Sequence, residues 1–457
     1  MVSPRSLLKG FTVAVLLVLP ALPLRPAASD PGRYFVLDNG LRVFLYEKRD
    51  LPLLHVVTGF GLGSKNETDA TSGFVHLLEH CILFRGTSER SGARVGADVR
   101  SHGAYFNAST GQDLSVFEIS LPSEYAVFAL KNQKDILFEL ALTPAELEAE
   151  KEVVLEEFNQ MEDDPDRSAA GRVLQELFAG HPYGRSVYGQ REVIAAATVD
   201  GLLGFYGKFF AADNAAMAVV GDFVTADMEK LVREVFGSLP RTGFAAEPVP
   251  MAAPLKKSSV LRLERDVRDG YLYLAFPAPD YNHADRYAMS VLVEALGRGV
   301  NPLLSARLQG GRDTVQRVSM AYLAFKSGGA AVVSIKAEPS DLPAVERAAV
   351  AFLRRAHDES YSKKDFISPE AEMAAFDFLE SAKNQIRFAS GQAEESGLQL
   401  AGSIVRHMLL NTREKPGRYL DEIGRVDSGD LRRAASKYLG RTEFAGVSVV
   451  PRKEGKR

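Results

Sequence analysis

The hydrophobic pattern of this chain changes period several times, and the changes divide the first half into strands and helices. Alternating apolar and polar residues predict strands, whereas apolar residues at three- to four-residue spacing predict amphipathic helices. The expected elements are strands within 33–63, a helix beginning near 74, strands near 104–121, helices over about 124–175 and 189–209, a strand at 215–220 and a helix at 226–236.

The second half repeats this order after a linker rich in Ala, Pro and Gly at residues 241–255. Helices on one face of a mostly antiparallel sheet give an α+β fold, used twice here. We therefore expect two homologous domains, at residues 30–240 and 256–457. The elements expected in the second are strands at 259–277, a helix at 283–297, a strand at 331–337, helices through 438 and a strand at 444–450.

The first 29 residues have the pattern of a targeting segment. Arg5 and Lys9 precede an apolar stretch at residues 10–24, and small residues at 26–29 follow it. This pattern predicts a cleaved signal peptide at residues 1–29 and a periplasmic or secreted mature chain. The stretch is short and interrupted by prolines, so no stable membrane span is expected. An uncleaved anchor is the alternative.

Composition narrows the classes of function. A chain of 457 residues with 46% hydrophobic content can build the cores of two or more domains. A formal net charge of −4 and a pI near 6.1 offer no basic surface for nucleic acid. The single cysteine, Cys81, excludes an internal disulfide, and we expect it to be buried.

The helix that begins near residue 74 contains the candidate chemistry. His76, Glu79 and His80 have the spacing His-x-x-Glu-His, which is the inverzincin signature. At 3.6 residues per turn the two imidazoles lie one above the other on one helix face, as two ligands of one metal must. Glu79 borders that metal, where its carboxylate could take a proton from bound water. A zinc site with Glu79 as the catalytic base is therefore predicted.

Zinc in a catalytic site usually takes a third protein ligand. The acidic helical segment at 146–158 offers several carboxylates, most of which we expect on a solvated face. Glu150 and Glu157 differ by seven residues, about 700° of helical rotation, and return to within roughly 20° of the same face. Glu156 does not share that face.

With these residues the chain resembles the pitrilysin/insulinase family of zinc metallopeptidases, in particular its short members that are similar to mitochondrial processing peptidase. Glu157 follows His80 at the family's spacing, and Glu150 and Glu157 match its Glu-x6-Glu pair. The resemblance implies that His76, His80 and Glu157 bind one Zn²⁺ per chain, while Glu150 supports catalysis from nearby. Other segments that resemble the family, in the same order, are 79–87, 103–110, 181–184 and 214–222.

Asn107 and Ala108 are candidate substrate-binding residues because they match the family's Gly-x-x-x-Asn-Ala-x-Thr strand. The resemblance implies that this strand is an exposed edge to which an extended peptide adds as a further strand. Backbone pairing of this kind binds many sequences. The plainer interpretation is an ordinary asparagine close to a turn.

Two classes of function fit these residues. The first is a zinc endopeptidase that cleaves peptides or unfolded segments inside a chamber between domains. The second is a non-catalytic scaffold or assembly subunit of the same fold. The presence of His76, Glu79, His80 and Glu157 favours the peptidase, because such a cluster is costly to bury without a metal.

The sequence of the second half suggests that the protein works with a partner subunit. It has no histidine pair in the helix at 283–297, so we expect only the first half to hold metal. In the family, this domain of a partner chain supplies an Arg and a Tyr seven positions apart. Here Arg312 and Tyr322 are ten positions apart, and Val315 stands seven before Tyr322. The spacing predicts that this chain has lost the Arg and Tyr pair. We therefore expect a heterodimer in which a homologous subunit supplies that pair. A small insertion that realigns the pair is the alternative.

Overall fold

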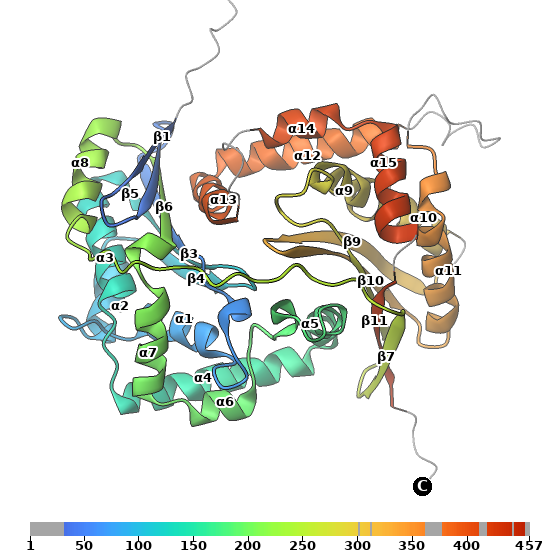
Figure 1. The fold of residues 1–457 in the computed structure, drawn as a ribbon, viewed down its shortest axis with the longest axis horizontal. Helices are drawn as coiled ribbons and strands as arrows, with labels where there is room; N and C mark the ends of the chain where they lie inside the picture. The colour runs from blue at the N-terminus through green and yellow to red at the C-terminus, as the bar shows by residue number, and fades with distance from the viewer. Residues whose placement is uncertain are drawn as a thin grey trace, which may run out of the picture. The chain divides into compact units, whose positions relative to one another are not determined.

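The computed structural model describes residues 32–299, 302–310, 313–361, 377–410, 418–440 and 443–452 (Figure 1). These residues form two β-sheets covered by helices, which confirms the predicted α+β fold. The signal peptide predicted at residues 1–29 lies outside the described residues, so the periplasmic or secreted location stays a prediction. Among the helices within these ranges, none is both long enough and apolar enough to span a bilayer.

The strands of the first sheet are β1 (Gly32–Val36), β2 (Arg42–Glu47), β3 (Leu53–Phe60), β4 (Tyr105–Thr110), β5 (Ser115–Pro122) and β6 (Ala215–Gly221). Their order across the sheet is β1-β2-β6-β3-β5-β4. Only β2 and β6 run parallel; the other neighbouring strands of this sheet, all described, are antiparallel. The central strand β6 is buried along its whole length, which explains its unbroken apolar sequence.

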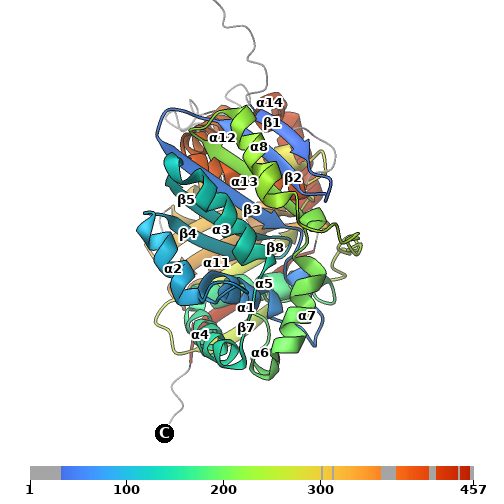
Figure 2. The same ribbon diagram turned by 90° about the vertical axis from the view of Figure 1, so that its left-hand side faces the viewer.

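The helices of the first half are α1 (Phe74–Phe84), α2 (Gly92–Ser101), α3 (Ala126–Phe138), α4 (Pro144–Asp163), α5 (Pro165–Leu177), α6 (Arg191–Ala196), α7 (Val199–Phe209) and α8 (Thr225–Phe236). Helices α1, α3, α7 and α8 contribute buried apolar side chains to one core with the sheet. Figure 2 shows α3 and α8 lying across this face of the strands.

The strands of the second sheet are β7 (Ser259–Arg265), β8 (Gly270–Pro277), β9 (Val315–Phe325), β10 (Gly328–Ala337) and β11 (Ala445–Pro451). Their order is β7-β11-β8-β10-β9, with β7 and β11 parallel. Strand β9 was missed in the sequence analysis. It is an edge strand with many partly exposed side chains, and the adjacent polar residues Gln316 and Arg317 interrupt the alternation that marks a strand.

The helices of the second half are α9 (Arg286–Val293), α10 (Leu303–Gln309), α11 (Leu342–Arg354), α12 (Phe378–Glu395), α13 (Gly397–Leu410), α14 (Tyr419–Arg425) and α15 (Ser428–Ala434). Helix α9 continues as a π-helical turn at Glu294–Arg298, within the range where a helix was expected. Residues 241–255 connect the two halves and form neither helix nor strand.

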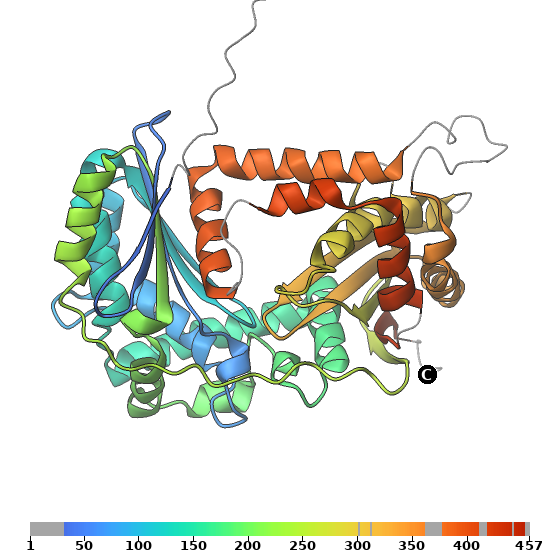
Figure 3. The same cartoon turned by 45° about the horizontal axis from the view of Figure 1, so that its top comes forward.

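Each sheet has its second face covered by a helix from the other half of the chain (Figures 1 and 3). Helix α13 packs on β3 and β6 of the first sheet, and α5 packs on β8 and β11 of the second. The expectation that helices lie on one face only was therefore wrong. The central strands carry apolar side chains on both faces, and both faces must be removed from water.

Gly59 in β3 allows α13 to approach the first sheet closely. A Cβ atom at this position would lie 2.6 Å from Val405 Cγ1 and 2.9 Å from Leu409 Cδ1. Both distances are shorter than van der Waals contact, so a larger residue would displace the helix.

Asp113 joins the two halves through a buried hydrogen-bond network. Its Oδ1 atom lies 2.8 Å from Lys65 Nζ and accepts a hydrogen bond from the Tyr183 hydroxyl at 2.9 Å. Its Oδ2 atom accepts the backbone N–H of Lys326 at 2.9 Å, and the Tyr183 oxygen accepts the backbone N–H of Ser327, also at 2.9 Å. The Lys65 and Asp113 side chains are only 8% and 5% exposed, so each charge needs the other to offset the free-energy cost of its burial.

We expect Asp113→Asn to lower the free energy of unfolding by about 3–5 kcal/mol, because it leaves the Lys65 ammonium buried without a counter-charge. Urea denaturation of the purified variant measures this. The double variant Asp113→Asn/Lys65→Met is the control, since it removes the unpaired charge and should recover part of the loss. An equal loss of stability in the two variants would contradict the role given to this ion pair.

Candidate metal centre

Helix α1, which carries the His-x-x-Glu-His motif, is fixed at its N-terminus. The Glu67 carboxylate accepts hydrogen bonds from the backbone N–H groups of Gly73 at 3.0 Å and Val75 at 2.8 Å. It thereby satisfies donors that a helix leaves free at its start. Gly73 has a φ of 99°, and a Cβ atom there would lie 2.8 Å from Ile194 Cγ1. Glycine is required for both the turn and the close approach.

Helix α4 packs against α1 and brings the acidic residues to the motif. Thr143 caps its first turn in a capping box with Glu146, so the start of the helix is well defined. Farther along, Glu150 is only 2% exposed, whereas the Glu157 side chain is 42% exposed. The predicted helical phase thus places both carboxylates toward α1, one buried and one open to solvent.

His76, His80 and Glu157 converge on one point. The Nε2 atoms of His76 and His80 lie 3.5 Å and 3.4 Å from the same carboxylate oxygen, Oε2 of Glu157. The potential ligand atoms of the three residues all lie within 4.8 Å of one another. Zinc bonds of about 2.0–2.1 Å in tetrahedral geometry separate ligand atoms by roughly 3.4 Å. This donor set therefore fits zinc in both chemistry and spacing.

Glu150 lies on the other side of the His80 ring. Its Oε2 atom is 3.4 Å from His80 Nδ1, and its Oε1 atom is 2.6 Å from Nη2 of Arg85. A carboxylate in this position orients the imidazole and leaves Nε2 free for a metal. The family resemblance implies that Glu150 supports the site from nearby, and this position beside His80 is consistent with that role.

The two imidazoles have different electrostatic environments. Burial lowers the pKa of His76 to about 4, and the neighbouring His80 adds to this effect. Burial also acts to lower the pKa of His80, but the nearby carboxylates, Glu150 first and then Glu157, outweigh it, and the pKa is raised. His76 is therefore neutral at pH 7, as a metal ligand must be.

Glu79 is half-buried on the same helix, beside the ligand pair. Burial raises the pKa of its carboxyl group above the usual range, although the Thr110 hydroxyl and His80 oppose the shift. A carboxylate with a raised pKa is a better proton acceptor near neutral pH. Thr110 is the last residue of β4, so Glu79 lies next to the end of that strand.

Strand β4 contains Asn107 and Ala108 and forms one edge of the first sheet. In the described part of the chain it pairs only with β5, and it packs against α1. Asn107 is exposed and Ala108 is half-buried. The free edge of β4 is thus available beside the metal ligands for a further extended strand.

Sequence reasoning missed Arg85 and Tyr188. Arg85 caps the C-terminus of α1 and reaches Glu150, and the Tyr188 ring lies edge-on to His76 with 5.3 Å between ring centroids. The position of Arg85, five residues after His80 and past the last helical turn, could have suggested a contact with α4. Tyr188 is brought to the site only by tertiary packing, so the sequence contains no local signal for it.

Arg312 and Tyr322 are predicted to be a lost substrate-binding pair, and the structure describes only one of them. Arg312 itself lies outside the described residues. Tyr322 is on β9, where its hydroxyl donates a hydrogen bond to the Pro279 carbonyl oxygen at 2.7 Å. Its hydroxyl is therefore already engaged within its own half.

Comparisons with known proteins identify the family. Residues 55–191 match the family model described as Insulinase (Peptidase family M16), and residues 196–367 match the one described as Peptidase M16 inactive domain. The chain belongs to peptidase family M16. The resemblance to the family is thereby confirmed, and the candidate ligands His76, His80 and Glu157 fall within the first of these two matches.

Similar proteins include an uncharacterized zinc protease of Mycobacterium leprae, 29% identical over 296 residues, which cover 64% of this chain and 66% of that protein. A probable mitochondrial-processing peptidase subunit beta of Schizosaccharomyces pombe is 25% identical over 440 residues, or 92% of this chain and 91% of that protein. The crystal structure of a protease from Helicobacter pylori has a TM-score of 0.82 at 22% identity, covering 92% of this chain and 99% of that chain. At this identity the structural likeness shows the fold alone.

We expect His76→Ala and Glu157→Ala to lose bound zinc, because each removes one of three ligands. Glu79→Gln should retain it, and Glu150→Gln should weaken zinc affinity about 10–100-fold through loss of the support to His80. Metal analysis of the purified variants and competition with a chromophoric chelator measure these effects.

Glu156→Ala is the matched control for the metal-binding variants. Glu156 is the exposed neighbour of Glu157 on α4, and its carboxylate accepts hydrogen bonds from Asn159 and Gln160 instead. Zinc content equal to wild type in Glu157→Ala, or lost in Glu156→Ala, would refute the ligand assignment.

Proposed function

We propose that this chain is a zinc-dependent endopeptidase that cleaves peptides or unfolded segments. The observation that carries the proposal is the convergence of His76, His80 and Glu157 on one point, with Glu79 beside them. Names of similar proteins, which include zinc proteases, support zinc as the metal.

The residues of the site have separate roles in the proposed reaction. His76, His80 and Glu157 would hold a zinc ion, which when bound would supply a Lewis acid for the scissile carbonyl and for the attacking water. Glu79 accepts the proton of the attacking water on its carboxylate and later donates it to the leaving amine. Glu150 keeps the His80 ring oriented, and the free edge of β4 holds the peptide backbone extended.

A non-catalytic scaffold is the second candidate function, and the name of one matching family model refers to an inactive domain. That match covers residues 196–367, however, whereas His76, His80 and Glu157 fall in the separate match at 55–191. The name therefore concerns mainly the second half and does not count against the metal centre.

We expect the zinc-loaded chain to cleave unstructured peptides and a chelator to abolish the cleavage. Glu79→Gln should lose most of the turnover while it keeps its zinc and its fold, because only the proton acceptor is removed. Cleavage of a quenched fluorogenic peptide measures this. Undiminished turnover in zinc-loaded Glu79→Gln would contradict the mechanism.

We also propose that the active form is a heterodimer with a homologous chain. Two observations support this proposal: the hydroxyl of Tyr322 is engaged by Pro279, and one similar protein is by name a subunit of a processing peptidase. In such a pair, this chain would supply the metal centre and the partner would supply an Arg and a Tyr to hold the substrate backbone.

The heterodimer predicts weak cleavage by the chain alone and strong cleavage after co-expression with a metal-free homologue from the same organism. The peptidase assay and the measured mass of the complex test this. Strong cleavage by the chain alone that is abolished by Tyr322→Phe or Arg312→Ala would show instead that the chain uses its own pair.

A further inference from the structure

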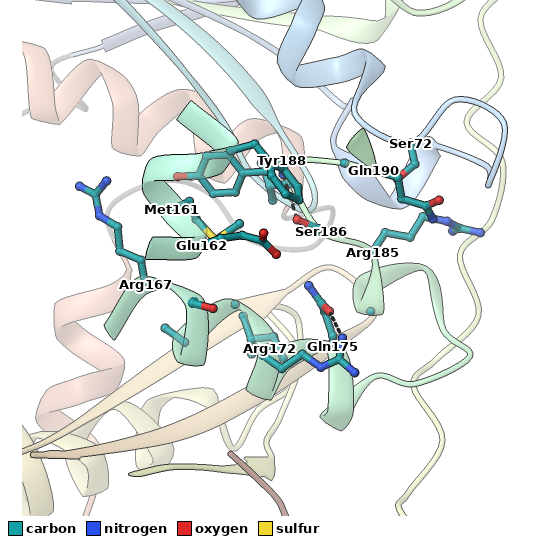
Figure 4. A pocket seen from close by; sticks show the side chains of 18 of the residues that line it. Ser72, Met161, Glu162, Arg167, Arg172, Gln175, Arg185, Ser186, Tyr188 and Gln190 are labelled. Carbon is teal, nitrogen blue, oxygen red and sulfur yellow. Dashed lines mark hydrogen bonds between the residues drawn. The ribbon is translucent and has the colours of Figure 1, made fainter. Parts of the chain in front are cut away.

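A cavity of about 1020 Å³ opens beside the metal centre (Figure 4). It is bounded by the C-terminal end of α4, by one side of α5, by the loop at residues 183–190 and by edge strand β7 of the second half. Tyr188 lines this cavity and also contacts His76, with ring centroids 5.3 Å apart. A substrate bound at the metal would therefore have neighbouring residues within reach of the cavity.

The charged residues that line the cavity are mostly basic: Arg167, Arg172, Arg185 and Arg265, against Glu162 as the one carboxylate among the described lining residues. These arginines differ in how far their charge is neutralised within the protein. Arg172 is fully paired, with Glu176 at 3.0 Å. Arg167 lies 3.8 Å from Asp164, a distance that gives only weak pairing.

Arg185 and Arg265 have the least compensation. Arg185 forms one ion pair in the described chain, with Asp69 at 3.9 Å, whose side chain is 95% exposed, and it also acts electrostatically on the buried Glu67 carboxyl group. The buried Nε atom of Arg185 has no hydrogen-bond partner within the described ranges. Arg265 has no carboxylate partner among the residues the structure describes. Arg185 and Arg265 thus line the cavity with charges that the described residues compensate only in part.

The rest of the wall is largely apolar. Phe158, Met161 and Leu174 line the side formed by α4 and α5, and Leu261 and Leu263 line the side formed by β7. An aliphatic side chain that ends in a carboxylate matches both properties, since its stem contacts the apolar wall and its charge pairs with guanidinium.

We propose that this cavity is a specificity pocket for an acidic side chain of the substrate, Glu or Asp, close to the scissile bond. The inference rests on the proposed peptidase function and adds the chemical class of substrate. Glu162, which is exposed, is the one described lining group that opposes it, and the partly compensated arginines outweigh its charge.

Matched fluorogenic peptides test the pocket. The peptides differ only in one residue, Glu, Gln or Lys, which is moved through each position on either side of the scissile bond. At one position Glu should give kcat/KM at least roughly tenfold above Gln, with Lys lowest, because a hydrogen-bonded charge pair contributes that much. The preference should shrink as salt is raised. Equal kcat/KM for Glu and Gln at every position overturns the proposal.

Variants assign the effect to the cavity. Arg185→Gln and Arg265→Gln should each reduce the ratio of kcat/KM between the Glu and Gln peptides, while cleavage of the Gln peptide changes little. Arg262→Gln is the matched control, because Arg262 is on the same strand β7, does not line the cavity and lies 3.8 Å from Glu346. An unchanged ratio in both cavity variants, or an equal fall in the control, overturns the assignment.

Measurements of peptide binding test the acidic pocket independently of the proposed peptidase activity. Fluorescence anisotropy with zinc-loaded Glu79→Gln measures peptide affinity without turnover, and the Glu peptide should bind more tightly than the Gln peptide. Tighter binding without cleavage by wild type would refute the peptidase and support the pocket. Cleavage without any charge preference would support the peptidase and refute the pocket.

Discussion

Both sheets of this protein have two apolar faces, and each half of the chain supplies helices for only one face of its own sheet. The second face of each sheet is covered by a helix from the other half of the chain: α13 packs on β3 and β6, and α5 packs on β8 and β11. Burial of apolar area is the largest favourable contribution to folding, so neither sheet would be stable with that face in water. The two halves therefore depend on each other for their cores as well as for their connection.

This exchange of helices also determines where Glu157, a candidate metal ligand, lies. Helix α5 begins directly after α4, which carries Glu157, and Asp164 ends one helix and caps the next. Asp166 then ties α5 to the second sheet, where it accepts a hydrogen bond from the Tyr273 hydroxyl at 2.7 Å and pairs with Arg317. The second half thus fixes the C-terminal end of the helix that carries the candidate third ligand. This gives the second half a physical role in the candidate site, although the three candidate ligands all belong to the first half.

How much of the site the sequence reveals depends on how local each interaction is. His76 and His80 are one helical turn apart, and Glu150 and Glu157 are two turns apart, so helical geometry alone predicts which side chains share a face. Arg85 and Tyr188 reach the same centre from a helix cap and a loop, and Glu67 fixes the start of α1; no periodicity describes these positions. The exchanged helices were missed for the same reason, because an amphipathic pattern shows that a face is buried but not which surface buries it.

Glu150 and Glu79 lie in one small region but have different surroundings. Glu150 is enclosed between Arg85 and His80, so its two carboxylate oxygens face a guanidinium group and an imidazole ring. Glu79 has no arginine beside it among the described residues; its Oε2 atom is buried without a hydrogen-bond partner there, and burial raises the pKa of the group. The raised pKa of Glu79 is the property that a proton acceptor near neutral pH requires. Arg85, which contacts Glu150, lies outside the motif, so the motif alone does not describe the surroundings of the two carboxylates.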